Sequence, residues 1–217
     1  EVSGKTLALH PLVLEDILNT EQRPKYEDYG DYIYIVVKML DLEGPENQMT
    51  IEQLSLVIGA NYVISFQERP GDVFNPVRER IRKGIGRIRK LRPDYTAYAI
   101  IDSVVDRYFD VIDFIGEKIE KLENELVSNP KPDTLRRIHD LRRELIFVRK
   151  SVWPLREVIA SMQRADSDLI HESTNIYLRD LFDHVIRTTD SVDTYRDMLS
   201  GMQDVYLSSI SNRTTEV

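Results

Sequence analysis

The second half of the sequence contains three long stretches in which apolar residues recur at alternating steps of three and four. This heptad spacing puts the apolar side chains along one side of a helix, so each stretch predicts a long helix that packs against its neighbours. A chain with three such stripes has to bury all of them, which favours long antiparallel, coiled-coil-like helices. The three sets of positions are Ile101, Val105, Tyr108, Ile112, Ile115, Ile119, Leu122 and Leu126; Ile138, Leu141, Leu145, Val148, Val152, Leu155, Ile159 and Met162; and Leu178, Leu181, Val185, Thr188, Val192, Tyr195, Leu199, Met202 and Tyr206.

The breaks in this pattern set the helix lengths. The first stretch ends at the sequence Ser128-Asn129-Pro130-Lys131-Pro132, whereas Pro154 lies inside the second stretch and predicts a kink, because the period continues through it. Helices of roughly 33 residues would be about 50 Å long, and a third helix from Leu169 to Val217 would reach about 73 Å. About 20 Å of it would project alone, and a lone helix is marginal in water, so the overhang predicts self-association.

The first half of the sequence lacks long heptad stretches and consists of shorter helix-like and strand-like runs. Pro11 stands at the first position of a short helix predicted to end at Asn19, with His10 as its cap. Three runs rich in β-branched and aromatic residues predict strands, and a basic amphipathic run predicts another helix. We therefore predict an α+β fold with an N-terminal domain at residues 1–93 and a long-helix region at 94–217. The predicted strands are Tyr32–Leu40, Ile51–Ile58 and Tyr62–Phe66, separated by turns at Gly44–Pro45 and Gly59–Asn61, and the helix is Phe74–Lys83.

Composition excludes several classes of protein. Acidic residues number 37 against 29 basic ones, and the net charge of −8 argues against a nucleic-acid partner. With no Cys and four scattered His, neither a disulfide scaffold nor a His/Cys metal site is expected. No uninterrupted apolar run approaches the roughly 18 residues of a membrane helix, so we expect a soluble chain. The dinucleotide, P-loop, serine-hydrolase and zincin motifs are absent, and we predict that the protein is not an enzyme.

Carboxylates are the chemical groups of interest. Glu15 and Asp16 lie in the second half of the short helix, where the helix dipole disfavours acids, and two adjacent carboxylates are suitable oxygen donors for a divalent metal. Asp102 begins an acidic row on the first long helix that we expect to be solvated or paired with Arg136, Arg142, Arg143 and Arg149 of the second helix. The row is Asp102, Asp106, Asp110, Asp113, Glu117 and Glu120. Asp180 carries no signal by itself, and Trp153 is expected to pack between helices.

The third helix also carries a row of small or acidic residues away from its apolar side. A solvated face normally contains long Lys, Arg and Glu side chains, and this row has none. Small hydroxyl and carboxylate groups on a self-associating helix suit a narrow hydrated axis that cations could pass. The row consists of Asp190, Thr194, Asp197, Gly201, Asp204, Ser208, Ser211 and Thr215.

The sequence resembles the CorA family of magnesium and cobalt transport proteins. The resemblance spans the chain and rests on five segments: His10–Asn19 followed by Gln22-Arg23-Pro24-Lys25, Gly71–Arg80, Trp153–Val158, Tyr177–His184 and Asp204–Thr214. It implies a cytoplasmic α/β/α sandwich with a shortened N-terminus, stalk helices, and a last helix that continues into the membrane as the pore-lining helix. It also implies five copies arranged as a funnel at the cytoplasmic face of the cell membrane. The family's Gly-Met-Asn signature of the outer pore mouth is not in this sequence.

The resemblance further implies roles for single residues. Asp16 would face Asp180 of a neighbouring subunit across a regulatory Mg²⁺ site, with Glu15 and Asp102 holding a second ion nearby. Asp204, Ser208, Ser211 and Thr215 would line the pore, with Asp204 forming an acidic ring. Metal bound between subunits would stabilise the closed state, so the domain would sense Mg²⁺; Co²⁺ or another divalent cation is an alternative ligand.

Three other readings remain open from the sequence. A related branch of the family transports zinc. A coiled-coil scaffold without ion handling would have the same helices. A metal-dependent hydrolase would have to bring Glu15, Asp16 and Asp102 together in one cleft.

Overall fold

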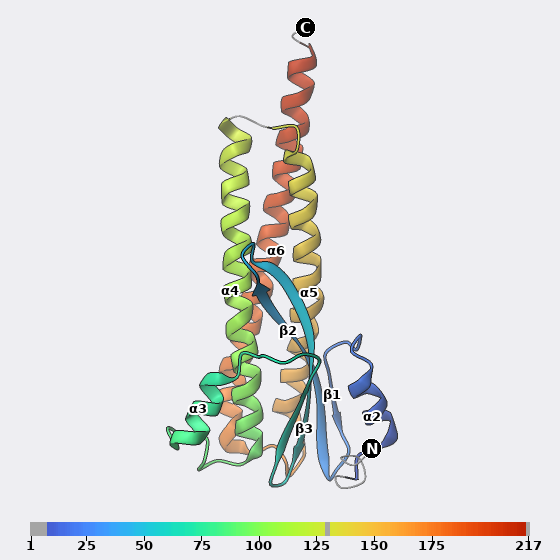
Figure 1. Cartoon of the computed structure of the whole chain (residues 1–217), viewed down its shortest axis with the longest axis vertical. Helices are drawn as coiled ribbons and strands as arrows, with labels where there is room; N and C mark the ends of the chain where they lie inside the picture. The colour runs from blue at the N-terminus through green and yellow to red at the C-terminus, as the bar shows by residue number, and fades with distance from the viewer. Residues whose placement is uncertain (1–7, 129–130, 216–217) are drawn as a thin grey trace.

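Three long helices form the body of the molecule. In the computed structural model, which describes residues 8–128 and 131–215 with side chains as far as residue 211, they are α4 (Pro93–Ser128), α5 (Thr134–Arg164) and α6 (Glu172–Thr215). Consecutive helices run antiparallel, and all three lie side by side (Figure 1). The predicted heptad positions are buried, apart from Tyr195, which is half-buried. The spacing of apolar residues therefore identified the bundle and its buried sides.

Helix α6 is the longest of the three. Its 44 residues correspond to about 66 Å, against about 54 Å for the 36 residues of α4 and about 46 Å for the 31 residues of α5. The helix begins at Glu172, three residues later than predicted, and its C-terminal end projects beyond the other two (Figure 1). Helix α5 continues through Pro154, as the unbroken period predicted.

Four antiparallel strands form one sheet in the order β1-β2-β3-β4. The strands are β1 (Lys25–Asp28), β2 (Tyr32–Glu43), β3 (Gln48–Gly59) and β4 (Val63–Gln67). The two predicted turns join β2 to β3 and β3 to β4. Strands β2 and β3 are longer than the predicted runs, because the end of β2 and the start of β3 pair through polar residues such as Glu43 and Gln48. Strand β1 was not predicted, since its sequence Lys-Tyr-Glu-Asp lacks the β-branched residues on which strand prediction depends.

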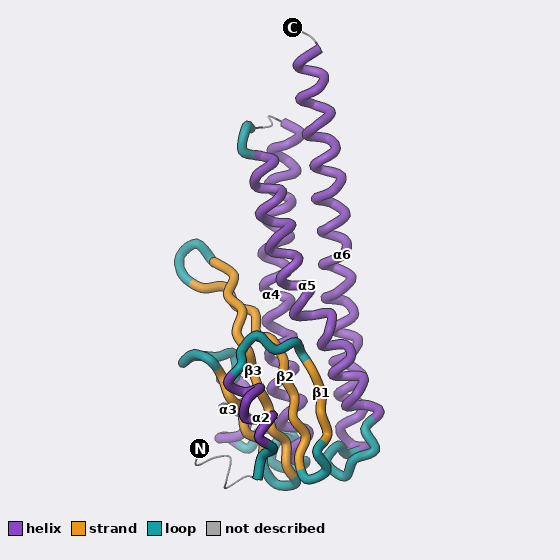
Figure 2. Tube along the Cα trace, turned by 90° about the vertical axis from the view of Figure 1, so that its right-hand side faces the viewer, coloured by secondary structure: helices purple, strands orange, loops and turns teal. Residues whose placement is uncertain are grey.

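The sheet is covered on both faces. Alternate residues of β2 point to opposite sides. Tyr32, Tyr34 and Val36 pack with α2 (Pro11–Leu18), whereas Ile33 and Ile35 belong to the large core shared with the long helices. Helix α3 (Asn75–Lys83) contributes its N-terminal residues to that same large core and packs beside α4. Figure 2 shows α2 and the long helices on opposite faces of the sheet, which confirms the α/β/α arrangement.

The sheet is attached to the bundle mainly through α4. The buried hydroxyl of Tyr108 donates a hydrogen bond to the carbonyl of Lys38 on β2, and Arg107 forms an ion pair with Asp41. Helix α4 begins at Pro93, next to the boundary proposed between residues 93 and 94. The division into domains 1–93 and 94–217 remains an interpretation of the sequence.

Candidate metal-binding residues

Helix α2 presents two of the four candidate carboxylates. His10 caps the helix as predicted, because its Nδ1 atom accepts a hydrogen bond of 3.2 Å from the backbone N–H of Leu12. The backbone N–H of His10 in turn donates to the hydroxyl of Tyr32 on β2 at 2.9 Å. The N-terminal end of α2 is therefore fastened to the sheet by a side chain of the strand beneath it.

Glu15 and Asp16 have different surroundings. Glu15 is exposed, and Asp16 is partly buried, with 22% of its side chain accessible. The carboxylate of Asp16 accepts hydrogen bonds from Gln22 Nε2 at 3.0 Å and from Lys25 Nζ at 2.6 Å. Burial lowers the pKa of Lys25, but its bonds to Asp16 and Glu27 outweigh this and raise the pKa above 10.5. In this arrangement the ammonium group of Lys25 neutralises Asp16.

Gln53 of β3 holds the C-terminal end of α2 in place. Its side chain is 1% exposed, and its Nε2 atom donates to the carbonyl oxygens of Asp16 and Asn19 at 3.1 and 3.2 Å. Its Oε1 atom accepts from the backbone N–H of Gln22 at 3.2 Å. The buried amide thus has hydrogen-bond partners for both its N–H₂ group and its oxygen, and these bonds fix the position of α2 relative to β3. Sequence reasoning missed Gln53, because nothing in its neighbourhood distinguishes it from an ordinary strand residue.

Asp102 lies on α4 in a cleft of about 600 Å³ between α4, β2 and α3. Burial raises the pKa of its carboxyl group, and the nearby charge of Asp106 adds to the rise; His184 and Arg80 act in the opposite direction. The net rise means that the ionised form of Asp102 lacks sufficient cationic compensation. A cation placed near this carboxylate would therefore be stabilised.

Asp180 lies on α6 with 68% of its side chain exposed, and its Oδ2 atom is 3.6 Å from His184 Nε2 one turn later. Its charge and that of Asp102 both contribute to raising the pKa of Tyr98, after burial, which is the largest cause. Both carboxylates are therefore near the Tyr98 hydroxyl. It also packs on Tyr177 of α6, with ring centroids 5.4 Å apart. The structure thus brings Asp102 and Asp180 to the same region, where α4 meets α6.

The four candidate residues do not form one cluster within a single chain. Glu15 and Asp16 lie on α2, across the sheet from the α4–α6 contact that carries Asp102 and Asp180 (Figure 2). Over residues 8–128 and 131–215, no group of three or more His, Asp or Glu side chains is arranged to hold a metal ion. A hydrolase site built from Glu15, Asp16 and Asp102 in one cleft is therefore not formed in the single chain.

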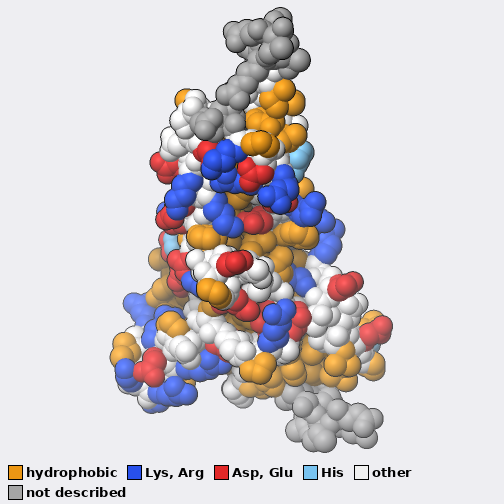
Figure 3. Space-filling model, turned by 45° about the horizontal axis from the view of Figure 1, so that its top comes forward, with side chains coloured by type: hydrophobic (Ala, Val, Ile, Leu, Met, Phe, Trp, Pro, Cys, Tyr) orange, Lys and Arg blue, Asp and Glu red, His pale blue; other side chains and the backbone are white. Residues whose placement is uncertain are grey.

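The small and acidic row on α6 faces away from its own core. Every member from Asp190 to Ser211 is exposed, and a Cβ atom added at Gly201 would meet nothing within 4 Å. Asp204 and Ser208 thus do not pack against α4 or α5; Thr215 belongs to α6, but its side chain lies outside the described residues. Exposed apolar side chains gather on the same part of α6, near the C-terminal end of the chain (Figure 3): Val205, Leu207 and Ile210.

The acidic row on α4 is mainly a solvated face. Past Asp102 its members are exposed, and Asp110 forms an ion pair of 2.8 Å with Arg107 of the same helix. The alternative expectation, that these acids pair with the arginines of α5, is wrong for the described part of the chain. Arg149 contacts Asp193 of α6 instead, and Arg142 donates to Ser200 of α6, because α5 presents these arginines to α6.

Comparison with known proteins gives a consistent result. Residues 4–217 match the family model described as CorA-like Mg²⁺ transporter protein. The chain is 49% identical over 214 residues to the cobalt/magnesium transport protein CorA of Thermotoga maritima, covering 99% of this chain and 61% of that protein. The chain thus spans less than two thirds of that relative's length. Among the described residues, no helix is long and apolar enough to cross a bilayer.

Two solved structures share the fold. The soluble domain of CorA from Methanocaldococcus jannaschii matches with a TM-score of 0.81 at 20% identity, covering 94% of this chain and 81% of that one. The cytoplasmic domain of ZntB from Vibrio parahaemolyticus matches with a TM-score of 0.78 at 14% identity, covering 96% of this chain and 82% of that one.

Proposed function

This chain belongs to the family of CorA-like Mg²⁺ transporter proteins, and from that premise we propose that it is the divalent-cation-sensing and gating region of a Mg²⁺/Co²⁺ transporter. In the proposed assembly, five copies form a ring at the cytoplasmic face of the membrane, and α6 leads toward the pore. The chain acts by binding metal and not by catalysis.

The observation that carries the proposal is the separation of the four carboxylates. Asp16 lies on an accessible helix on one face of the sheet, and Asp180 lies on the opposite side of the molecule with 68% of its side chain exposed. Among the residues that the structure describes, neither has enough acidic neighbours in the same chain to hold a metal ion. Neighbouring copies in a ring would bring the Asp16 side of one chain against the Asp180 side of the next, with Glu15 and Asp102 close by.

The mechanism we propose is electrostatic. Carboxylates from two chains repel each other unless a divalent cation lies between them. Mg²⁺ keeps several waters and takes one or two carboxylates, so a shared pair of aspartates is a sufficient set of protein ligands. The ion binds the tight ring better than the loose one, so its concentration sets the population of the closed state.

The exposed row on α6 supports a second part of the proposal. We place Asp204, Ser208, Ser211 and Thr215 on the axis of the ring, where the carboxylates of Asp204 would attract cations and the hydroxyl groups would contact them through water. The exposed apolar residues Val205 and Leu207 would then contact neighbouring copies of α6.

Metal-dependent association tests the proposal directly. Sedimentation velocity of the chain with and without Mg²⁺ should show larger species in the presence of the ion. Asp16→Asn and Asp180→Asn remove a ligand charge but keep the shape, so each should abolish the Mg²⁺ effect. Asp166→Asn, an exposed acid in the connection between α5 and α6, is the matched control and should behave as the unchanged chain. Sedimentation that is the same with and without Mg²⁺ would instead favour a coiled-coil scaffold without ion handling.

One observation favours zinc as an alternative ion. His184 Nε2 lies 3.6 Å from Asp180 Oδ2, and an imidazole beside a carboxylate suits Zn²⁺ better than Mg²⁺. Titration with Mg²⁺, Co²⁺ and Zn²⁺ distinguishes the two readings. If zinc is the ion, His184→Gln should weaken Zn²⁺ binding; if magnesium is the ion, this change should leave Mg²⁺ binding intact.

A further inference from the structure

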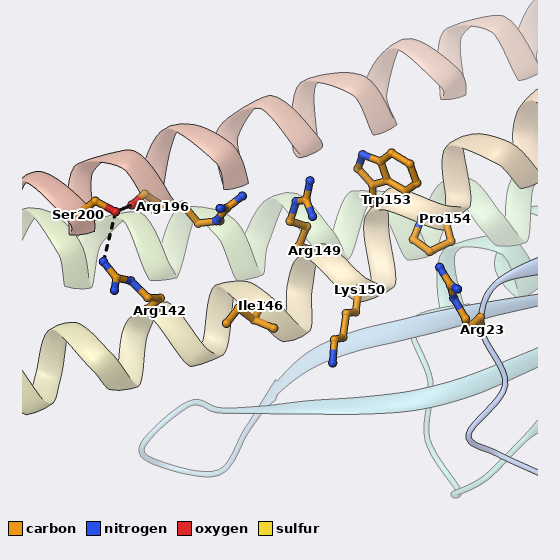
Figure 4. Close-up of a pocket in the computed structure, with 9 residues that line it drawn as sticks. All are labelled: Arg23, Arg142, Ile146, Arg149, Lys150, Trp153, Pro154, Arg196 and Ser200. Carbon is orange, nitrogen blue, oxygen red and sulfur yellow. Dashed lines mark hydrogen bonds between the residues drawn. The ribbon is translucent and has the colours of Figure 1, made fainter.

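A basic groove lies between α5, α6 and the segment that precedes β1. Its volume is about 830 Å³, which is within the usual range for small-molecule sites. Helix α5 supplies most of the wall, α6 supplies two residues, and Arg23 approaches from the segment before β1 (Figure 4). We call this the basic groove and define it by its lining: Arg23, Arg142, Ile146, Arg149, Lys150, Trp153, Pro154, Arg196 and Ser200.

The charge of the basic groove is opposite to that of the whole chain. Five of its nine lining residues are cationic and none is acidic, although the chain carries a net charge of −8. A single carboxylate, Asp193, serves two of the five: its Oδ1 atom is 3.2 Å from Arg149 Nε and 3.1 Å from Arg196 Nη1. Among the described residues, Arg23 and Lys150 have no carboxylate within ion-pair distance. Gathering these cations costs electrostatic free energy that a bound anion would offset.

An aromatic surface lies beside these cations. Trp153, which the sequence predicts to pack between helices, is 43% exposed. The guanidinium carbon of Arg149 lies 6.0 Å from the centroid of its ring. A large aromatic ring left open to a cavity, with a planar cation next to it, is suited to stacking with a flat ring of a ligand.

We propose that the basic groove binds an organic oligophosphate of the nucleoside triphosphate class. The cations of α5 and α6 bind the phosphate oxygens, and arginine is well suited to this because its planar fork donates two parallel hydrogen bonds. The indole of Trp153 stacks on the base. The five cations come from three segments of the chain, so a single phosphate could contact only some of them. A ligand with several linked phosphates could contact more of them and therefore fits better. This site is independent of the proposed metal-dependent association, since it shares no residue with the four candidate carboxylates.

The single tryptophan of the chain makes the site directly observable. Trp153 is the only Trp, so any change in tryptophan fluorescence reports on the basic groove. ATP is titrated into the chain in the presence of EDTA, so that removal of Mg²⁺ by ATP cannot produce the signal. Inorganic triphosphate and adenosine are titrated in parallel, and a short polyglutamate peptide tests for a general preference for anions.

Two groove variants and one control make the test specific. Lys150→Gln and Arg142→Gln each remove one groove cation and should weaken ATP binding about tenfold, as expected for the loss of one charge-assisted hydrogen bond. Arg143→Gln removes the same charge from the adjacent, exposed position outside the groove and should bind ATP like the unchanged chain. Triphosphate should bind more weakly than ATP, and adenosine should not bind.

Four results would overturn the proposal. The first is the absence of a saturable ATP signal, and the second is equal weakening in Arg143→Gln and the groove variants. Triphosphate binding as tightly as ATP would refute the stacking role of Trp153. Polyglutamate binding as tightly as ATP would refute the preference for phosphate and indicate an acidic protein segment as the occupant.

Discussion

The Nζ atom of Lys25 on β1 lies 2.6 Å from the Oδ2 atom of Asp16. Lys25 thus forms an ion pair with the carboxylate that we propose as a ligand of the divalent cation. Both side chains are about three-quarters buried. A cation that binds Asp16 must therefore displace an ammonium group, which weakens the site. A weak site suits an abundant ion such as Mg²⁺, because its occupancy can then change with concentration.

Removing the competing ammonium should strengthen metal binding. We expect Lys25→Met to tighten divalent binding roughly 3- to 10-fold, the equivalent of one partly exposed ion pair. Calorimetric titration with Mg²⁺ measures this, and circular dichroism checks that the fold is kept. Lys83→Met, which removes an exposed lysine from α3, is the control. Weaker binding in a folded Lys25→Met variant would mean that Lys25 positions Asp16 for the ion and does not compete with it.

Loss of the Gln53 amide should loosen α2. We expect Gln53→Leu to lower the free energy of unfolding by about 2–3 kcal/mol, because it leaves buried polar backbone groups of α2 and of the segment after it without partners. Gln48→Leu, at the exposed beginning of the same strand, should have little effect. Denaturant unfolding measures both. Equal stability of the two variants would show that packing alone holds α2.

The pH dependence of stability should report on Asp102. Its pKa is raised in the folded state, so the protonated carboxyl stabilises the fold fully below pH 3.8, and this contribution is lost as the pH rises through the folded pKa. Without divalent metal at pH 7, Asp102→Asn should therefore have a higher Tm than the unchanged chain. Asp113→Asn, on an exposed turn of α4, should not. If Mg²⁺ binds near Asp102, added Mg²⁺ should raise the Tm of the unchanged chain more than that of Asp102→Asn.

Gating should depend on the two aspartates that we place across the subunit boundary. In the complete transporter, Asp16→Asn or Asp180→Asn should leave the pore open at Mg²⁺ concentrations that normally close it, because the ligand charge is lost while the side-chain shape is kept. Flux into vesicles at a series of internal Mg²⁺ concentrations measures this. The same inhibition curve in both variants would contradict the metal-sensing proposal.

Asp204 should affect conduction and not folding. Its side chain is exposed on α6, so Asp204→Ala leaves no buried partner without a bond and the chain should keep its stability. In the complete transporter we expect lower cation occupancy at the cytoplasmic pore mouth and altered flux. Asp183→Ala, an exposed acid of α6 outside the small and acidic row, is the control. Unchanged flux in Asp204→Ala across a range of Mg²⁺ concentrations would remove Asp204 from the proposed axis.

Helix periodicity was readable from the sequence because it is a local property. Positions such as Ile119, Leu145 and Val185 recur at heptad spacing, and each is fully buried, since a stripe repeated over ten turns leaves only one side of a helix to bury. The His10 cap and the turns around Gly44 and Gly59 are equally local. Strand β1 was not readable, because its four mostly polar residues become a strand only by pairing with β2.

What the tertiary structure alone decided is which charged groups meet. Asp16 and Lys25 are separated by nine residues, Gln53 reaches α2 from a strand 34 residues away from Asn19, and Arg142 meets Ser200 at a separation of 58. No sequence period relates such pairs, since their contact depends on how the sheet stacks on the bundle. The sequence by itself determined the helices, their buried sides and the family. The packing of the layers determined that Asp16 is neutralised by a lysine, that Asp102 lacks a sufficient counter-charge, and that five cations line one groove together with an exposed tryptophan.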